Sequence, residues 1–473
     1  MANFAATPEA VARVPRAVAF RYDALPLNVE SGVLSVGVAD PSDVSVVDAL
    51  RAATRLRVRP LAMPRDAIRA HLHAAYADGA SRSESARDDA PAVRAVDATF
   101  ARAIAAHASD VHVEPAGGGG GRVRLRIDGI LHELDTVPRA LFPAFVSRIK
   151  LLAGMDVADR RTPQDGRYGV PFDGRDVDVR VASIPTVDGE KLVVRLLDRF
   201  ATTPDLASLG MPSALLESYR AAVHAPWGFV VVTGPTGSGK TTTLYASLAA
   251  IDTGERNVCT VEDPVEMRIA GTAQVHVNPR AGVTFPLVLR AFMRQDPNVV
   301  MVGEMRDVET AAVAVSAALA GQLVFTSLHA NDAPRTIDRL VELGVARHSL
   351  AAALTMVVSQ RLVRTLCEQC RAQEAVPAVH RDAFAKRADS WWIARGCRAC
   401  GQTGYLGRTG VYEAIEVDDA VRDAIASGRS SVQLAQHAAR TGYRPMIDDG
   451  VAKVAAGRTS FAELVRVVGW TPR

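Results

Sequence analysis

The amino-acid sequence predicts an α/β protein of several domains, and three observations support this prediction. Short apolar runs, each long enough for one buried strand, alternate with helical stretches between residues 229 and 326. A glycine-rich loop directly follows the first of these runs and begins at Gly234. Two CxxC pairs, which begin at Cys367 and Cys397, lie beyond the last run. At 473 residues the chain is long enough for about three domains, each with a core of its own.

The composition argues against nucleic-acid and membrane-surface partners. A formal net charge of +3 and 23% charged residues of both signs give no bulk attraction for polyanions. No apolar run approaches the roughly 20 residues that cross a bilayer, and residues 1–14 lack the pattern of a cleaved signal segment. Four of the five cysteines form CxxC pairs, which indicate metal ligands in a reducing compartment. We therefore expect a cytoplasmic protein without direct membrane insertion and without a nucleic-acid partner.

Residues 1–77 are expected to form a small α/β domain. An alternating apolar strand lies at 33–38, and amphipathic helical stretches lie at 43–53 and 65–76. The composition then changes, because residues 78–91 hold almost no large apolar side chain and carry mixed charge. Such a segment cannot support a core, so we expect a flexible linker there.

A second, α+β domain is expected over residues 92–200. It opens with a helix and continues as short strands with a period of two. In the segment RVRLRID, which begins at Arg122, three arginines alternate with three apolar residues, so one face of the strand is predicted to be core and the other strongly positive. The glycine run at 117–121 is expected to be a hairpin loop, since no helix follows it as a phosphate-binding loop would require.

A linker at 201–211 leads to the third domain, which is expected over residues 212–365. Its apolar runs are typical of buried parallel strands with helices on both faces, and they lie at 229–233, 258–261, 299–302 and 323–326. A four-cysteine module is expected at 366–410, and a helical region at 411–473.

A phosphate-binding loop is the strongest signal in the sequence. The segment GPTGSGKT, which begins at Gly234, matches GxxxxGK[ST] and lies between an apolar strand and a helix. Its glycines let successive N–H groups point at phosphate oxygens, and the start of the helix adds positive potential. Lys240 is expected to contact the β and γ phosphates of ATP, and the Thr241 hydroxyl to hold Mg²⁺. The predicted nucleotide-binding residues are Gly234, Pro235, Thr236, Gly237, Ser238, Gly239, Lys240, Thr241 and Thr242.

Polar residues follow three of the predicted core strands. Ligands of open parallel sheets gather at the carboxyl ends of the strands, and ATP hydrolysis needs a carboxylate that organises Mg²⁺ and water. Glu304 has the position of a Walker B acid, and Glu262 is a candidate for activating water; the sequence leaves open which of them is the base. His329 follows the next strand and would lie near the γ phosphate. The alternatives are acids that cap loops or pair with arginines, and a structural histidine.

The remaining motif is a set of four cysteines. Two CxxC pairs separated by a few tens of residues can close a tetrahedral sulfur site, for which Zn²⁺ is the usual occupant. We predict a structural zinc site, because four thiolates leave no open coordination position; a redox role is the alternative. The predicted ligands are Cys367, Cys370, Cys397 and Cys400.

In kind and order, the motifs resemble those of the type II secretion and type IV pilus assembly ATPases, the family of general secretory pathway protein E. The resemblance covers the chain from about residue 108 to its end, and it rests on SDVHVEP at Ser109, RIDG at Arg126, PQDGR at Pro163, VRVASIPTVDGEK at Val179, GPTGSGKTTTLYA at Gly234, TVEDPVE at Thr260, RQDPNVVMVGEMRD at Arg294 and SLHANDAPRT at Ser327. It implies an ATP hydrolase with a RecA-like P-loop domain, a preceding α+β domain, a four-cysteine zinc module and a helical C-terminal region.

The resemblance also implies a homo-hexamer in which nucleotide lies between the second domain and the RecA-like domain. By motif position, Arg180 and Arg195 are the catalytic arginines that swing onto the phosphates, and Arg167, Arg290 and Arg294 are further candidates. A cation that arrives only on domain closure would neutralise charge in the transition state. Surface salt bridges are the alternative role of these arginines.

Family resemblance further implies work at the inner membrane. The expected partners are a bitopic inner-membrane protein, bound by the first domain, and a polytopic platform protein. The four-cysteine insertion resembles the assembly branch of the family rather than the retraction branch. The segment QRLVRTLC at Gln360 resembles the secretion branch and NDAPRT at Asn331 the pilus branch, and the short first domain favours a type II secretion system and its pseudopilus. The alternatives are type IV pilus assembly, a nucleotide-sensing scaffold with negligible hydrolysis, and a related ring motor that moves nucleic acid, which the near-neutral charge disfavours. The chain departs from the family at Gln322, where its histidine box lacks a histidine. It also lacks the longer leading module that binds a cyclic dinucleotide in some pilus members, so no such ligand is expected.

Overall fold

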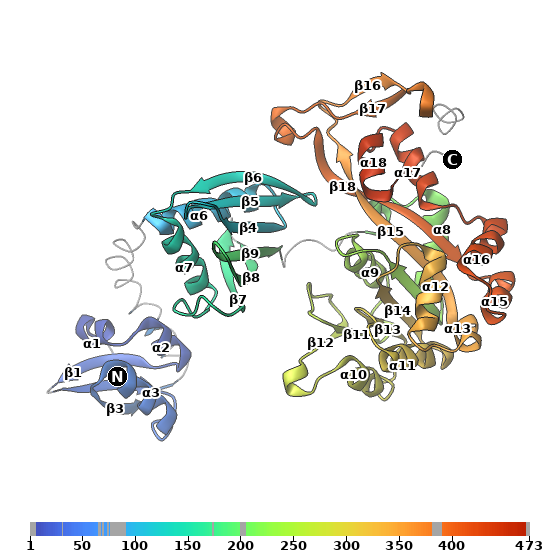
Figure 1. Ribbon diagram of the computed structural model, residues 1–473. Helices are drawn as coiled ribbons and strands as arrows, with labels where there is room; N and C mark the ends of the chain where they lie inside the picture. The colour runs from blue at the N-terminus through green and yellow to red at the C-terminus, as the bar shows by residue number, and fades with distance from the viewer. Residues whose placement is uncertain are drawn as a thin grey trace.

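The computed structural model describes residues 6–30, 32–64, 68, 71–72, 75, 91–172, 175–198, 205–380 and 390–469. Figure 1 shows three folded units along the chain: a leading unit in blue, a second unit in teal and a large third unit from green to red. The linker predicted at 78–91 lies outside the described residues except for Pro91, and so does most of the helix expected at 65–76. Residues 201–204 of the second linker are also outside them.

The leading unit is a three-stranded sheet in the order β1-β2-β3, with β1 and β2 antiparallel and β2 and β3 parallel. The strand and the helix predicted at 33–38 and 43–53 are confirmed as β2 and α3. Leu34, Val36 and Val38 alternate with less buried residues along β2 and pack in the core of the unit. The elements are α1 (Pro8–Arg13), α2 (Arg16–Arg21), β1 (Leu25–Glu30), β2 (Val33–Val38), α3 (Val44–Thr54) and β3 (Arg57–Ala62).

The second unit is a six-stranded antiparallel sheet in the order β6-β5-β4-β9-β8-β7. Helices α6 and α7 cover one face, and apolar residues of the strands pack against them (Figure 1). The glycine run that was predicted to be a hairpin loop joins β4 to β5. The elements are α6 (Pro91–Ala105), β4 (Asp110–Pro115), β5 (Gly121–Ile127), β6 (Ile130–Val137), α7 (Phe142–Leu152), β7 (Gln164–Phe172), β8 (Arg175–Thr186) and β9 (Gly189–Asp198).

The arginine face of β5 is less positive than the sequence predicts. The alternation itself is confirmed, but acids of the neighbouring strand β4 lie across from the arginines. Glu114 forms ion pairs with Arg122 at 3.2 Å and with Arg124 at 2.7 Å, and Asp110 lies 3.6 Å from Arg126. Burial alone would raise the pKa of Glu114, but hydrogen bonds from Arg124 and Lys191, together with their positive charges, lower it to about 2. Periodicity in one strand shows which side chains share a face, not what the next strand places opposite them.

A buried ion pair fixes the edge of the second unit that carries β7. Lys150 of α7 is fully buried, and its ammonium donates to Glu190 Oε1 at 2.7 Å and to the carbonyl oxygen of Asp159 at 2.6 Å. Glu190 lies at the start of β9, and Asp159 lies in the loop that leads to β7. One ammonium therefore joins a helix, a hairpin and a loop, and the loop sets the entry of the strand that carries Arg167.

The third unit is built on a seven-stranded sheet in the order β12-β11-β13-β14-β10-β15-β18, parallel except for β18. The four predicted core strands are confirmed as β10, β11, β13 and β14. The elements up to β15 are η1 (Leu206–Leu209), α8 (Ser213–His224), β10 (Gly228–Thr233), α9 (Lys240–Ala249), β11 (Val258–Glu262), β12 (Thr272–His276), η2 (Pro279–Ala281), α10 (Phe285–Phe292), β13 (Val299–Val302), α11 (Val308–Leu319), β14 (Leu323–Leu328), α12 (Ala333–Glu342), α13 (Arg347–Ala353) and β15 (Leu354–Leu366).

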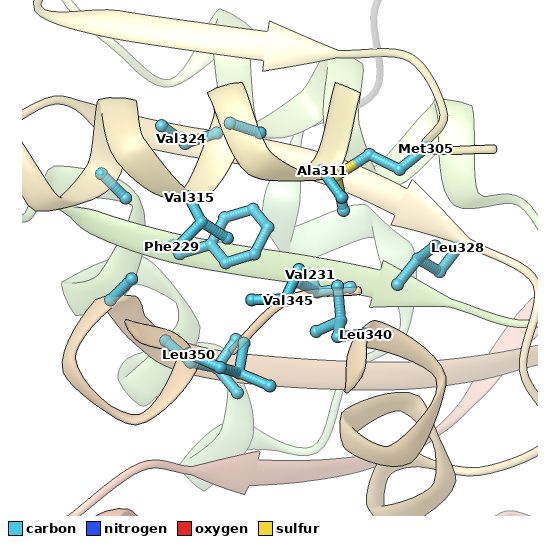
Figure 2. Close-up of a cluster of buried hydrophobic side chains, with 14 of the residues drawn as sticks. Phe229, Val231, Met305, Ala311, Val315, Val324, Leu328, Leu340, Val345 and Leu350 are labelled. Carbon is cyan, nitrogen blue, oxygen red and sulfur yellow. The ribbon is translucent and has the colours of Figure 1, made fainter. Parts of the chain in front are cut away.

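Helices cover both faces of this sheet, which explains why its strands are apolar without interruption. Phe229 and Val231 of β10 face one layer, where they pack with Val315 of α11, Leu340 of α12 and Leu350 of α13 (Figure 2). The alternate residues of β10 face the other layer, against α8 and α9. Each fully buried side chain of this size contributes about 1.5–3 kcal/mol. Strand β10 is therefore anchored from both sides.

The chain after β15 returns to the same sheet. Strand β18 pairs antiparallel with β15 from Met356 opposite Glu416 to Leu366 opposite Tyr405. The boundary expected between residues 410 and 411 thus falls inside β18, because a strand with mixed polar and apolar residues does not stand out beside the helices that follow. The elements are β16 (Ala372–Ala375), η3 (Ala378–His380), β17 (Ser390–Ile393), η4 (Arg398–Cys400), β18 (Tyr405–Glu416), α15 (Asp419–Ala426), α16 (Ser431–Ala438), η5 (Ala439–Thr441), α17 (Met446–Ala455) and α18 (Phe461–Val468).

Among the described helices, none combines the length and the apolar composition that crossing a bilayer requires.

Replacing Lys150 tests the ion pair of the second unit. Lys150→Met should lower the free energy of unfolding of this unit by about 3–5 kcal/mol, because it leaves the buried Glu190 carboxylate without its partner. Hydrogen exchange of the β7, β8 and β9 amides in the full chain measures the effect. The double variant Lys150→Met/Glu190→Gln should lose less, and unchanged exchange in the single variant would contradict the assignment.

Candidate functional site

The predicted site residues of the third unit gather at one edge of its sheet. The glycine-rich loop follows β10, Glu262 is the last residue of β11, Glu304 follows β13 and His329 follows β14. These strands are parallel and adjacent or nearly adjacent, so their carboxyl ends meet. Open α/β sheets bind ligands at this edge.

The loop between β10 and α9 has a backbone shape that requires glycine. Gly234 and Gly239 have φ angles of 150° and 87°. A Cβ at Gly234 would lie 2.5 Å from the carbonyl oxygen of Gln360, so no larger residue fits without a shift of the backbone. Helix α9 begins at Lys240 and has no side-chain cap. The N–H groups of its first turn are therefore open to an anion.

The other predicted loop residues divide by exposure. Pro235, Thr236 and Gly237 form the exposed crest of the loop, whereas Ser238 is buried beneath it. Thr241 and Thr242 lie in the first turn of α9, half-buried and exposed respectively. The N–H groups of Thr236 and Gly237 and those of the uncapped start of α9 are donors of the kind that hold phosphate groups.

Lys240 lies folded into this loop. Its ammonium donates to the carbonyl oxygens of Gly234 at 2.9 Å and Pro235 at 3.1 Å. Burial lowers the pKa of Lys240 to about 8, against an opposing effect of Glu304 and with a further decrease from Arg361. An ammonium that is held by only two neutral carbonyls is available to an anion that replaces them.

Glu304 and His329 lie together on the same side of the loop. Glu304 forms an ion pair with Arg306, and one of its oxygens lies 3.9 Å from His329 Nε2. Burial lowers the pKa of His329, and the nearby Lys240 lowers it further, against the effect of Glu304. The imidazole is therefore biased toward its neutral form, and Glu304 is the acid that faces Lys240.

Glu262 has a different environment. Its side chain is buried, and both of its oxygens accept hydrogen bonds, Oε2 from the Tyr245 hydroxyl and Oε1 from Thr260 at 2.6 Å and from Gln274 at 3.1 Å. Tyr245 belongs to α9, so this carboxylate is tied to the helix that follows the loop. In this conformation Glu262 orders the neighbourhood of the loop, whereas Glu304 is open to it.

The predicted arginines form a ladder on the second unit. Arg167, Arg180 and Arg195 lie opposite one another on β7, β8 and β9. They line a cavity of about 530 Å³ on the polar face of the sheet. Asp110 of β4 is 3.2 Å from Arg195, which leaves the ladder with an excess of positive charge.

The ladder faces the third unit. A second cavity, of about 410 Å³, is lined by Arg167 and Arg180 on one side and by Asp263 and His276 on the other. Burial raises the pKa of Glu266, and the nearby Arg180 and Arg195 oppose the increase. Within the described ranges, no hydrogen bond or ion pair joins these arginines to the loop at 234–242.

A separate contact joins the two units at the RIDG turn. Asp128 accepts a hydrogen bond from the Gly407 N–H at 2.8 Å and lies 3.5 Å from Arg408 Nε. Gly407 and Arg408 belong to β18, which follows the cysteines. The second unit therefore touches the third both near the site and beside the metal module.

Some predicted residues lie elsewhere. Arg290 of α10 pairs with Glu309 of α11, and Arg294 donates to the carbonyl oxygen of Arg290. Both arginines precede β13, so they lie toward its amino end, away from the edge that carries the loop. Gln322, which stands in the altered histidine box, likewise precedes β14 and accepts the Gly228 N–H through its carbonyl oxygen.

The sequence alone indicated no role for Tyr245, Arg306 or Gln360. Tyr245 and Arg306 lie within quoted motifs, but only the structure shows that they contact the two acids. Gln360 contacts the loop from β15, far along the chain. Polar residues inside otherwise apolar strands and helices were the available signal.

The four cysteines come together at the end of β15. Their sulfur atoms all lie within 4.8 Å of one another, and the separations between Cys367 and Cys397 and between Cys370 and Cys400 are both 3.8 Å. A tetrahedral site with Zn–S bonds of about 2.3 Å has sulfur atoms about 3.8 Å apart, whereas a disulfide joins them at about 2.05 Å. The set therefore fits a zinc ion.

The environment of Cys400 favours its thiolate, whereas burial raises the pKa of Cys370 to about 11. Burial works to raise the pKa of Cys400, but N–H donors from Cys397 and Gly404 outweigh it and lower the pKa to about 6. Those donors lie 3.2 Å and 3.1 Å from the Cys400 sulfur. Metal binding requires the deprotonated form, so the backbone around Cys400 is suited to a metal-bound sulfur.

Comparisons with known proteins agree with these observations. The model of the family "Type II/IV secretion system protein" matches residues 85–466, and the MshEN domain matches residues 2–82. The second match covers the leading unit, which the resemblance in the sequence did not include. Together the two matches span nearly the whole chain.

Three relatives illustrate the similarity. The type II secretion system protein E of Klebsiella pneumoniae is 46% identical over 382 residues, which are 80% of this chain and 76% of that protein. The protein transport protein HofB homolog of Escherichia coli is 40% identical over 459 residues, 96% of this chain and 97% of that protein. The type IV pilus assembly ATPase PilB of Myxococcus xanthus is 36% identical over 498 aligned residues, 98% of this chain and 87% of that protein.

Among solved structures, the ATPase DotB of Legionella pneumophila has a TM-score of 0.57 at 21% identity, over 78% of this chain and 93% of that one. This likeness supports the predicted α/β P-loop fold. The family match extends over far more than half of the residues and includes the loop, both acids and all four cysteines. The chain therefore belongs to the family of type II/IV secretion system proteins and is an ATPase.

Proposed function

We propose that this protein is a hexameric ATPase that powers pseudopilus assembly in a type II secretion system at the inner membrane. One observation supports the proposal above the others. The phosphate-binding loop and its acids lie on the third unit. A ladder of three arginines, of which only Arg195 has an acidic ion-pair partner among the described residues, lies on the second unit and faces the third across a cavity. A site divided between two units lets a chemical step change how the units are placed.

In the proposed reaction, the loop and the first turn of α9 hold the phosphates of ATP. Lys240 exchanges its two carbonyl partners for phosphate oxygens, and Thr241 provides a hydroxyl for Mg²⁺. Bound Mg²⁺ supplies charge neutralisation at the phosphates. Glu304, which faces Lys240, organises the metal and the water, with His329 beside it. Glu262 remains the second candidate for the base, and its release from Tyr245 would be required.

The arginines complete the site when the two units close. Arg180 and Arg195 carry charge that the nearby acids do not fully neutralise, and they face the loop at 263–266. Closure would bring them onto the phosphates, where they stabilise the transition state. Because they reach the phosphates only when the units move, hydrolysis and movement are coupled. In a ring of six copies the movement passes to the membrane partners.

The secretion system is the first assignment, and type IV pilus assembly is the second. The relatives named for type II secretion are the more similar in sequence, at 46% identity for the Klebsiella protein. The alignment with the pilus ATPase PilB, however, spans 98% of this chain and so includes the leading unit. Deletion of the gene in its host separates them: loss of exoprotein secretion supports the first assignment, and loss of surface pili the second.

We further propose the partners and the metal. The leading unit docks on a bitopic inner-membrane protein, the ring acts on a polytopic platform protein, and the chain works on the cytoplasmic side of the membrane through these contacts. The four cysteines hold one structural Zn²⁺, for which the sulfur spacing is suitable. The metal joins the end of β15 to the start of β18.

Removing the ammonium tests the nucleotide site. Lys240→Ala should lower phosphate release by at least about 10²-fold, because one preorganised cation at the phosphates is lost. The steady-state rate is measured on the assembled ring, with the number of subunits counted by native mass spectrometry. Unchanged turnover in a folded variant would refute the assignment, and negligible turnover of the unchanged protein as a hexamer would favour the nucleotide-sensing scaffold.

The pKa of Lys240 predicts a pH dependence of binding. Burial lowers this pKa to about 8 in the free protein, so the ammonium that attracts phosphate is lost as the pH rises through 8. Between pH 7 and pH 9 the Kd of a non-hydrolysable Mg·ATP analogue should increase by about tenfold, as the protonated fraction falls to roughly one in ten. The variant Lys240→Arg keeps its charge and should show a flat profile. A flat profile in the unchanged protein would contradict the prediction.

Metal analysis tests the cysteine site. The protein purified without chelator should contain one Zn²⁺ per chain, and Cys397→Ser or Cys400→Ser should lose it because three sulfurs hold the ion poorly. Native mass spectrometry counts the metal. Cys259→Ala is the matched control, since this buried cysteine lies in β11, away from the cluster. Absence of zinc in the unchanged protein would overturn the proposal.

A further inference from the structure

The underside of the phosphate-binding loop rests on one glutamine of a distant strand. Gln360 lies in β15, next to β10 in the sheet. Its amide nitrogen Nε2 donates to the carbonyl oxygen of Ser238 at 2.7 Å, inside the loop. Its amide oxygen Oε1 accepts from the Thr243 hydroxyl at 2.8 Å, in the first turn of α9. One side chain therefore joins the loop to the helix that follows it.

This contact is buried, and the loop and the strand approach each other closely. Gln360, Ser238 and Thr243 are 1%, 3% and 1% exposed. Two glycines of the loop lie directly against the glutamine: a Cβ at Gly234 would be 2.5 Å from its carbonyl oxygen, and a Cβ at Gly239 would be 3.1 Å from Nε2. The close approach of loop and strand at Gly234 therefore requires glycine, and the amide of Gln360 is shielded from solvent.

The same hydrogen-bonded group reaches the connection to the second unit. The hydroxyl of Tyr412, in β18, lies against the Thr243 hydroxyl and donates to the carbonyl oxygen of Leu209 at 2.9 Å. Leu209 ends η1, in the segment that joins the second unit to the third. A chain of contacts therefore leads from Gln360 through Thr243 and Tyr412 to the segment that connects the second unit to the third.

We propose that Gln360 is a positioning residue for nucleotide binding, which holds the loop in its phosphate-binding shape before nucleotide arrives. The proposal rests on the proposed role of the loop. A loop of glycines has many alternative backbone conformations, and ordering it at the moment of binding reduces affinity. Gln360 holds the carbonyl oxygen of Ser238 toward β15, so the N–H groups of the loop remain on the side opposite β15, where phosphate would bind. The glutamine touches no phosphate and acts through the loop alone.

The test replaces the amide while keeping its shape. Gln360→Met preserves length and volume but removes both hydrogen bonds, and Gln360→Glu keeps the acceptor for Thr243 but loses the donor to Ser238. Both variants should raise the Kd for Mg·ADP by about tenfold, which corresponds to about 1.4 kcal/mol. The KM for ATP should rise by a similar factor, while kcat at saturating ATP stays within about threefold, because the bound loop reaches the same final shape. Gln360→Glu carries the test if the methionine variant does not fold.

A matched control separates positioning from loss of stability. Tyr219 donates or accepts a buried hydrogen bond with Ser247, one turn further along α9, at 2.8 Å. Tyr219→Phe loses a buried bond to the same helix but does not touch the loop, so its Kd should remain unchanged even if its Tm falls. An increase in the Kd of this variant equal to that of the Gln360 variants would overturn the proposal.

Lys240→Ala distinguishes a failure of this proposal from a failure of the site itself. If Lys240→Ala loses nucleotide and both Gln360 variants bind as the unchanged protein does, the positioning role is wrong and the site stands. If Lys240→Ala binds Mg·ADP with unchanged affinity, the assignment of the loop is wrong, and the positioning role falls with it.

Discussion

The burial of strand β10 between two layers of helices is the constraint on which the site depends. Its side chains alternate between the two cores, so the strand cannot slide or rotate without opening both of them. The loop that follows starts from a fixed point, and the parallel neighbours of β10 deliver Glu262, Glu304 and His329 to the same edge. The positions of the site residues in the third unit thus follow from the packing of helices on both faces of its sheet.

The second unit follows a different logic. One face of its sheet is core, and the other is a charged surface. Among the described residues, acids form ion pairs with Arg124 and Arg195 but not with Arg167 or Arg180. The arginines of β5 are paired with acids of β4, whereas the ladder of β7, β8 and β9 has few such partners. An arginine without an acidic partner in its own sheet can interact with a group of another unit. The pairing within the sheet therefore decides which arginines keep an unneutralised charge.

Local features of the sequence predicted much of this structure. A few neighbouring residues were enough to predict the core strands, the loop at Gly234 and the cysteine cluster, and each of these forms as expected. Features that depend on long-range pairing were not predictable. The acid opposite Arg124 comes from another strand, the hydrogen bonds that engage Glu262 come from three elements, and Gln360 is 122 residues from Ser238. One sequence shows which groups exist, but the fold decides which of them meet.

The topology around the cysteines has a consequence of its own. The chain leaves the sheet at the end of β15 and returns at the start of β18, and these strands are antiparallel neighbours, so the segment between Leu366 and Tyr405 connects two paired strands. Insertions at such a point change the outline of a protein without altering the order of its strands. The sheet does not require this insertion to be complete, yet Trp391 and Val376 from it pack with Leu464 near the end of the chain. The connection between β15 and β18 therefore supports helices α17 and α18, and its removal would expose their apolar contact residues to solvent.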